Sequence, residues 1–311
     1  MHTWLLLGGG LLALYLGAEA LVRGSVALAL RWGVAPLVVG ITILAFGTSA
    51  PEWVVSMQAA HDGESGLALG NVIGSNIANL LFVLGLAAVI KPIKVQRQLV
   101  RREIPVLLIG TLVLALMLIN HELSRWEGVL LLVGFVAFIG YAVRAAHKQA
   151  TRARHEDVPA LPHIGRIPAW WWLGGGLVAL WVGARWLVGG ALALALQLGW
   201  SSYVIGLTLV AIGTSLPEIA TSIVASARGK GELVLGNAVG SNLFNMLAIL
   251  GLTAALFGID SRQVTPVDTV LLVASALVCL PIMRTGFVIS RREGAGLLAG
   301  YAGYLVWLAW G

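Results

Sequence analysis

Long runs of apolar residues, separated by short polar breaks, make up most of the chain. Two of these breaks read HDGES at 61–65 and ARGKGE at 227–232. A helix needs about 20 apolar residues to cross the hydrocarbon core of a bilayer. This criterion predicts an all-α polytopic membrane protein with about ten transmembrane helices, near residues 3–30, 36–60, 66–90, 104–120, 126–146, 168–197, 202–227, 232–257, 267–284 and 293–310.

The composition excludes a soluble domain. Hydrophobic residues make up 59% of the 311 residues and charged residues only 11%, whereas soluble domains carry about 25% charged residues. The mean hydropathy is +0.91. The formal charge of +6 is not the footprint of a nucleic-acid partner, because the basic residues lie in loops between apolar runs. The first apolar run has no basic region before it, so we expect a retained span rather than a cleaved signal peptide.

Lysine and arginine gather in alternate loops, and this asymmetry predicts the orientation in a cell inner (plasma) membrane. Basic residues are enriched in cytoplasmic loops. The opposite loops hold only Arg125 and Arg262. We therefore expect both termini outside the cytoplasm and the 147–166 loop inside it. The enriched loops hold Arg31, the basic residues of 91–102 and of 144–166, Arg228, Lys230, Arg284, Arg291 and Arg292.

Two stretches of the chain repeat one another at a constant offset of 166 residues. GTSAPE at 47–52 returns as GTSLPE at 213–218, and GNVIGSN at 70–76 returns as GNAVGSN at 236–242. Asn79 and Asn245 follow at matching positions. Duplication for packing alone would preserve apolar positions best. Here the polar positions are preserved, which favours a shared functional site.

The polar, proline-containing segment 147–166 divides the chain into a first repeat at 1–146 and a second at 167–311. Each repeat contains five predicted spans, and an odd number forces the two copies into opposite orientations. Inverted repeats are the plan of many secondary transporters, whose site lies near the midplane where the repeats meet.

Each copy places a glutamate inside an apolar segment, where a carboxylate is costly and functional by default. In the first copy, Thr48, Ser49 and Glu52 are spaced for one helix face. Pro51 cannot donate a backbone hydrogen bond, so the carbonyl of Gly47 is freed. The second copy repeats this pattern with Thr214, Ser215, Glu218, Pro217 and Gly213.

The following helix of each copy adds more oxygen atoms. Ser75 and Asn79 are spaced i, i+4, as are Ser241 and Asn245. Calcium takes 6–8 oxygen ligands, and two carboxylates neutralise one divalent ion. No His–Cys cluster supplies the nitrogen and sulfur ligands of zinc or copper. Interhelical hydrogen bonding is at least as good an interpretation as coordination for Asn71, Asn76, Asn237 and Asn242.

The motif GTSxPE followed by GNxxGSNxxN, once in each half, resembles the α-repeats of the calcium/cation antiporter superfamily, which includes prokaryotic sodium/calcium exchangers. The resemblance implies a secondary antiporter that exchanges Ca²⁺ for Na⁺ by alternating access. It implies no enzyme activity, no cofactor and a functional monomer. The ion-binding roles that it implies fall on Thr48, Ser49, Glu52, Ser75, Asn79, Thr214, Ser215, Glu218, Ser241, Asn245 and the backbone carbonyls of Ala45 and Ala211.

The chain departs from that pattern at Asn245, where many prokaryotic members carry aspartate. This leaves the sodium stoichiometry open. Exchange of H⁺ for Ca²⁺ or another divalent cation is the alternative function. A channel is disfavoured by a duplicated midplane site, and an intramembrane protease would need His or paired Asp residues that no predicted span supplies. Glu19 and Arg185, also 166 residues apart, are expected to pair across the halves.

Overall fold

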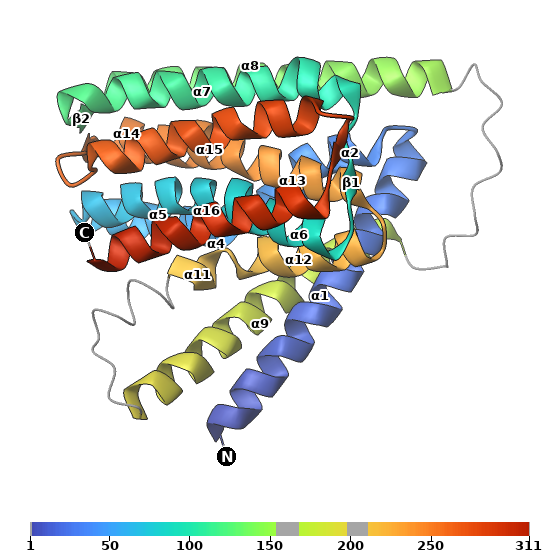
Figure 1. The fold of residues 1–311 in the computed structure, drawn as a ribbon, viewed down its shortest axis with the longest axis horizontal. Helices are drawn as coiled ribbons and strands as arrows, with labels where there is room; N and C mark the ends of the chain where they lie inside the picture. The colour runs from blue at the N-terminus through green and yellow to red at the C-terminus, as the bar shows by residue number, and fades with distance from the viewer. Residues whose placement is uncertain (1, 154–167, 198–210, 311) are drawn as a thin grey trace.

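The computed structural model describes residues 2–153, 168–197 and 211–310. It is a bundle of helices (Figure 1). In the first half the helical elements are α1 (His2–Trp32), α2 (Pro36–Val39), η1 (Gly40–Leu44), α3 (Ala45–Thr48), α4 (Ala50–His61), α5 (Ser65–Ile77), η2 (Ala78–Val83), α6 (Leu84–Ile90), η3 (Leu99–Glu103), α7 (Ile104–Met117), η4 (Leu118–Asn120) and α8 (Arg125–Ala153). The second half contains α9 (Ala169–Gln197), α11 (Ala211–Thr214), α12 (Leu216–Ala227), α13 (Gly231–Leu243), η6 (Phe244–Ile249), α14 (Leu250–Phe257), α15 (Pro266–Arg284) and α16 (Arg291–Trp310).

These helices occupy the ranges predicted from apolar run length. Within the described residues, seven helices are long and apolar enough to cross a membrane, or eight if the bent α2–α4 segment counts as one span. A polytopic helical membrane protein is thereby confirmed, while the ten-span count stays a prediction. Residues 202–210 of the seventh predicted span lie outside the described residues, as do 154–166 of the predicted linker. Helix α8 continues to Ala153, past its expected end at residue 146.

Two short antiparallel ribbons tie loops of one half to loops of the other. Strand β1 (Ile93–Lys94) pairs with β4 (Val288–Ile289), and β2 (Glu122–Leu123) pairs with β3 (Ile259–Asp260). β1 and β3 occupy the same position in the repeat, and so do β2 and β4. The two ribbons lie at opposite ends of the bundle (Figure 1). Equivalent strands therefore sit at opposite ends, as inverted repeats require.

Helices α1 and α9 pack against each other and project from the rest of the bundle (Figure 1). Glycines make this close approach: a Cβ added to Gly17 would lie 2.7 Å from the Leu180 backbone nitrogen. A Cβ on Gly183 would lie 2.7 Å from the nitrogen of Leu14. Small residues at such contacts let membrane helices approach backbone to backbone.

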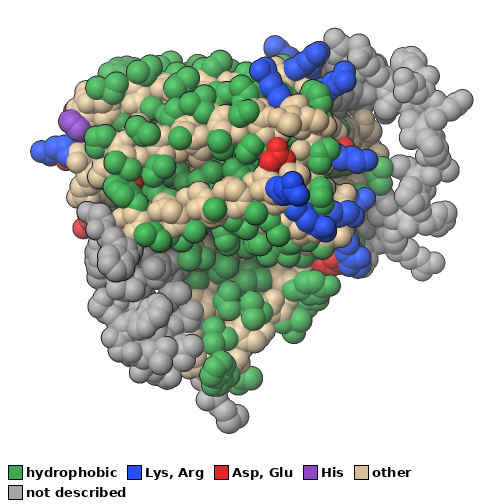
Figure 2. Space-filling view, in the orientation of Figure 1, with side chains coloured by type: hydrophobic (Ala, Val, Ile, Leu, Met, Phe, Trp, Pro, Cys, Tyr) green, Lys and Arg blue, Asp and Glu red, His purple; other side chains and the backbone are tan. Residues whose placement is uncertain are grey.

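The best-buried spans are α5–η2–α6 and α13–η6–α14. In these spans 72% and 83% of the most apolar window is buried, against 11% in α8. Hydrophobic side chains cover much of the visible face of the bundle, and lysine and arginine gather at one end (Figure 2). The polar residues of the repeated motifs therefore lie in the centre of the molecule, inside an apolar shell.

Candidate functional site

The two glutamates of the repeated motifs lie in the buried centre. Glu52 and Glu218 are each 1% exposed. Each stands in the first turn of a helix, α4 or α12, that starts after a break at Ser49 or Ser215. The axis bends by 46° at the first break. Because a helix N-terminus carries partial positive charge, this position favours a carboxylate.

Hydroxyl groups cross between the halves to reach these carboxylates. Ser49 Oγ donates to Glu218 Oε1 at 3.2 Å, and Ser215 Oγ donates to Glu52 Oε1 at 3.2 Å. The sequence interpretation placed Ser49 with Glu52 on one helix face. The helix bends at Ser49, and i→i+4 backbone hydrogen bonds continue through the bend, from Ser49 to Ala45 and from Trp53 to Ser49. Each glutamate is bound by the serine of the other repeat.

The threonines also reach across, toward asparagines. Thr48 Oγ1 donates to Asn237 Oδ1 at 3.1 Å, and Thr214 Oγ1 donates to Asn71 Oδ1 at 3.3 Å. Asn71 Nδ2 donates to the backbone carbonyl of Glu52 at 3.2 Å and to Ser56 Oγ at 2.9 Å. The prediction that these asparagines form interhelical hydrogen bonds is confirmed. From α5 and α13, these asparagines hydrogen-bond the threonine of each motif, and Asn71 also bonds the backbone of Glu52.

Several oxygen atoms of the cluster are buried without a hydrogen-bond partner among the described residues. They include the second carboxylate oxygens, Glu52 Oε2 and Glu218 Oε2, with Asn79 Oδ1, Asn245 Oδ1 and Ser241 Oγ. Unpaired buried oxygens are costly, and neighbouring carboxylates repel each other. A hard cation relieves both costs at once, so this donor set fits Ca²⁺ or Na⁺.

Asn79 and Asn245 lie in π-helical turns, η2 and η6, at equivalent positions of the two repeats. Such turns recur at functional sites in proteins. Neither turn was predicted, because no sequence signal distinguishes i→i+5 from i→i+4 pairing. In the preceding turns, Asn242 Nδ2 donates to the backbone carbonyl of Asn76 at 3.0 Å. These two residues are repeat-related, so the pseudo-two-fold axis passes between α5 and α13.

The remaining predicted site atoms lie close by. Ser75 Oγ lies 3.4 Å from Ser215 Oγ. The carbonyl of Ala45 accepts from the Ser49 backbone nitrogen at 3.0 Å and lies 3.5 Å from Thr48 Oγ1. Ala211 is the first residue of α11, which ends at Thr214. The cluster thus contains two charged groups among neutral oxygens. Nowhere in the described ranges do three His, Cys, Asp or Glu residues gather to hold a metal.

The expected pair between Glu19 and Arg185 is wrong. Glu19 accepts from Arg23 Nε at 2.7 Å on its own helix and from Arg228 Nε at 3.1 Å. The Arg185 guanidinium lies 5.7 Å from the ring centroid of Trp181. Repeat-related residues of an inverted pair meet only close to the pseudo-two-fold axis, as Asn76 and Asn242 do, and Glu19 and Arg185 contact other residues.

The geometry defines a polytopic helical membrane protein with a buried, oxygen-rich cluster suited to a cation, and comparisons with known proteins place it among the cation antiporters. A structure of the sodium–calcium exchanger NCX_Mj soaked with 10 mM Na⁺ and 10 mM Sr²⁺ matches with a TM-score of 0.86 and 33% identity, over 98% of both chains. The chain is 30% identical over 344 residues to the sodium/calcium exchanger MaX1 of Methanosarcina acetivorans, covering 98% of this chain and 97% of that one.

It is also 38% identical over 316 residues to the inner membrane protein YrbG of Escherichia coli K12, covering 99% of this chain and 96% of that one. The family model described as sodium/calcium exchanger protein matches residues 2–144 and, a second time, residues 168–310. The chain belongs to the sodium/calcium exchanger family, a family of transporters.

Proposed function

We propose that the protein exchanges Ca²⁺ for Na⁺ across the inner membrane by alternating access. The observation that carries this proposal is the pair of buried glutamates, each bonded by a serine of the opposite repeat and surrounded by neutral oxygens. One Ca²⁺ balances both carboxylate charges. Two Na⁺ do the same, and every further Na⁺ leaves the site positive, so the two ions compete for one charge-balanced cage.

The neutral donors replace the hydration shell of the ion. We assign this role to the hydroxyls and amides that the sequence predicted, namely those of Thr48, Ser49, Ser75, Asn79, Thr214, Ser215, Ser241 and Asn245, and to the carbonyls of Ala45 and Ala211. Calcium tolerates flexible geometry with 6–8 oxygens, which suits a site assembled from two moving halves. The glutamates balance the charge of the ion. The neutral groups select between ions by how many oxygen atoms they supply and how closely those atoms approach the ion.

Inverted repeats make the same site reachable from either side when the halves exchange conformations. The opposed ribbons and the Asn76–Asn242 contact support this symmetry. We assign the repeats to 1–146 and 167–311, the intervening loop to the cytoplasm, and both termini to the opposite side. We also assign the exchange activity to a single chain, because both repeats that form the cluster lie within it.

Flux measurements in proteoliposomes test the proposal. ⁴⁵Ca²⁺ uptake is measured with a Na⁺ gradient at equal pH, and separately with a pH gradient in the absence of Na⁺. We expect uptake to follow the Na⁺ gradient. Uptake that follows the pH gradient and ignores Na⁺ would replace this function with H⁺/Ca²⁺ exchange. Unitary currents in a planar bilayer would replace it with a channel.

A further inference from the structure

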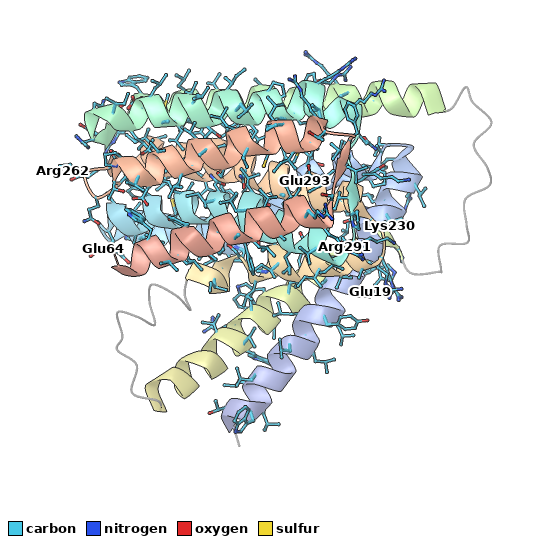
Figure 3. The ribbon with its side chains drawn as sticks, viewed as in Figure 1. Glu19, Glu64, Lys230, Arg262, Arg291 and Glu293 are labelled. Atoms are coloured by element: carbon cyan, nitrogen blue, oxygen red, sulfur yellow. The ribbon has the colours of Figure 1, made fainter. Side chains whose placement is uncertain are left out.

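An ion pair ties α1 to the helix that carries Glu218. The Arg228 guanidinium lies 2.8 Å from Glu19 Oε1 and donates through Nε to Glu19 Oε2 at 3.1 Å. Arg228 directly follows the last residue of α12. The Glu19 side chain is 13% exposed and that of Arg228 52%. The pair therefore fastens α1 to α12 at one end of the bundle, where Figure 3 shows Glu19 with Lys230 and Arg291.

The repeat reproduces this pair with both charges reversed. The counterpart of Glu19 is Arg185 on α9, and the counterpart of Arg228 is Asp62, which directly follows α4. Glu64, two positions after Asp62 in the sequence, lies at the opposite end of the bundle from Glu19 (Figure 3). The first half thus carries an acid at both positions, Glu19 and Asp62, and the second half carries a base at both, so each pairing across the halves is attractive.

Only one of the two pairs is formed in this structure. Both carboxylate oxygens of Asp62 accept from Gln58 Nε2, each at 2.9 Å. Arg185 lies over the Trp181 ring. In the portions of the chain that the structure describes, no ion pair joins Arg185 to Asp62. The two repeat-related contacts are therefore in different states within one molecule.

In an inverted-repeat transporter the halves exchange conformations as the access side changes. A contact made by one half in one state is then made by its counterpart in the other. We propose that the two pairs are alternative latches: Glu19–Arg228 holds the state closed at its own end, and Arg185–Asp62 forms when the opposite end closes. This proposal rests on the alternating access of the proposed function.

Anchoring at a membrane interface does not explain the arrangement. Interfacial anchoring accounts for single lysines and arginines that reach water from helix ends. It does not require a complementary acid on another helix, and it does not account for the reversal of both charges at two repeat-related positions. A latch requires an acid–base pair at each end, and the acids of the first half and the bases of the second supply both pairs.

Thiol accessibility tests the latches without depending on transport. Cys279 is buried and is the sole cysteine of the chain, so Cys279→Ala gives a background for single probes. Ser222 is buried on α12, between Glu218 and Arg228, and its counterpart is Ser56 on α4. Ser222→Cys and Ser56→Cys report opening at the two ends. An impermeant maleimide is added to sealed vesicles from either side, without calcium.

We expect Glu19→Gln to raise the labelling rate of Ser222→Cys about threefold, because a partly exposed ion pair shifts a two-state ratio by that order. Arg228→Gln gives the same result, and the exchange Glu19→Arg with Arg228→Glu restores the parent rate. Arg185→Gln and Asp62→Asn act in the opposite direction: they lower labelling at Ser222→Cys and raise it at Ser56→Cys.

Arg23→Gln is the matched control, because it removes the other partner of Glu19 and breaks no contact with α12. It should leave labelling at the parent rate. The proposal is overturned if Glu19→Gln and Arg228→Gln label like the parent, if the charge exchange fails to restore the rate, or if both pairs shift labelling in one direction. The labelling rate is measured in the absence of calcium and does not depend on transport. A failure of the latch proposal can therefore be told apart from a failure of the proposed exchange.

Discussion

The two halves of the cluster share their crossing contacts and differ in their supporting ones. Ser49 and Ser215 reach the opposite carboxylate at the same distance, 3.2 Å. Asn71 ties α5 to α4 through two donated hydrogen bonds, whereas the Nδ2 of its counterpart Asn237 is buried without a partner in the described structure. The symmetric serine–glutamate bonds lie at the ion site. The asparagine bonds differ between the halves, and they hold α4 to α5 more firmly than α12 to α13.

The largest expected effect tests the symmetric part. Glu52→Gln and Glu218→Gln should each weaken calcium binding about 30-fold or more, because removing one of two buried charges leaves the ion unbalanced. Isothermal titration with Ca²⁺ on purified protein measures this. Glu103→Gln is the control, since Glu103 is also buried but lies outside the cluster and accepts from Gln98. Near-normal affinity in either site variant would contradict a shared site.

A smaller effect concerns the crossing hydroxyls. Ser49→Ala and Ser215→Ala each remove one hydrogen bond to a carboxylate, worth about 1.5–3 kcal/mol, so affinity should fall about tenfold or more in both. Competition between ⁴⁵Ca²⁺ and unlabelled Ca²⁺ in detergent compares them directly. A loss confined to one variant would show that only one carboxylate faces the ion. Ser65→Ala, at the start of α5, serves as a control outside the cluster.

The smallest effect separates the two halves. Asn71→Ala breaks contacts to Glu52, Ser56 and Thr214, and should cost about 1–3 kcal/mol of folding free energy. Asn237→Ala breaks one recorded contact, to Thr48, and should cost less. Thermal unfolding in the same detergent ranks the two variants. Equal losses, or a larger loss in Asn237→Ala, would remove the proposed difference between α4–α5 and α12–α13.

Sequence reasoning located the helices and the polar motifs, because apolar run length and residue spacing are local properties. It placed the carboxylates in buried helices and gave the asparagines their bridging role. It did not predict that Ser49 bonds the glutamate of the other repeat, because that contact depends on how the two halves pack together. It also missed the π-helical turns at η2 and η6, whose width depends on neighbouring helices rather than on the residues within them.

The partner of Glu19 could not be predicted from the sequence repeat. The repeat offset correctly related Glu19 to Arg185, but equivalent residues of an inverted repeat meet only close to the pseudo-two-fold axis. Arg228 has no sequence relation to Glu19, and only the packing of α1 on α12 brings the two together. Repeat arithmetic therefore identifies which residues correspond, and the fold decides which residues touch.

The crossed serines have a consequence for how such a chain could have arisen. Each glutamate accepts from the serine of the other half's motif, so a single repeat folded alone would lack that bond to its carboxylate. Two copies inserted in opposite directions would complete one another through the same pair of bonds.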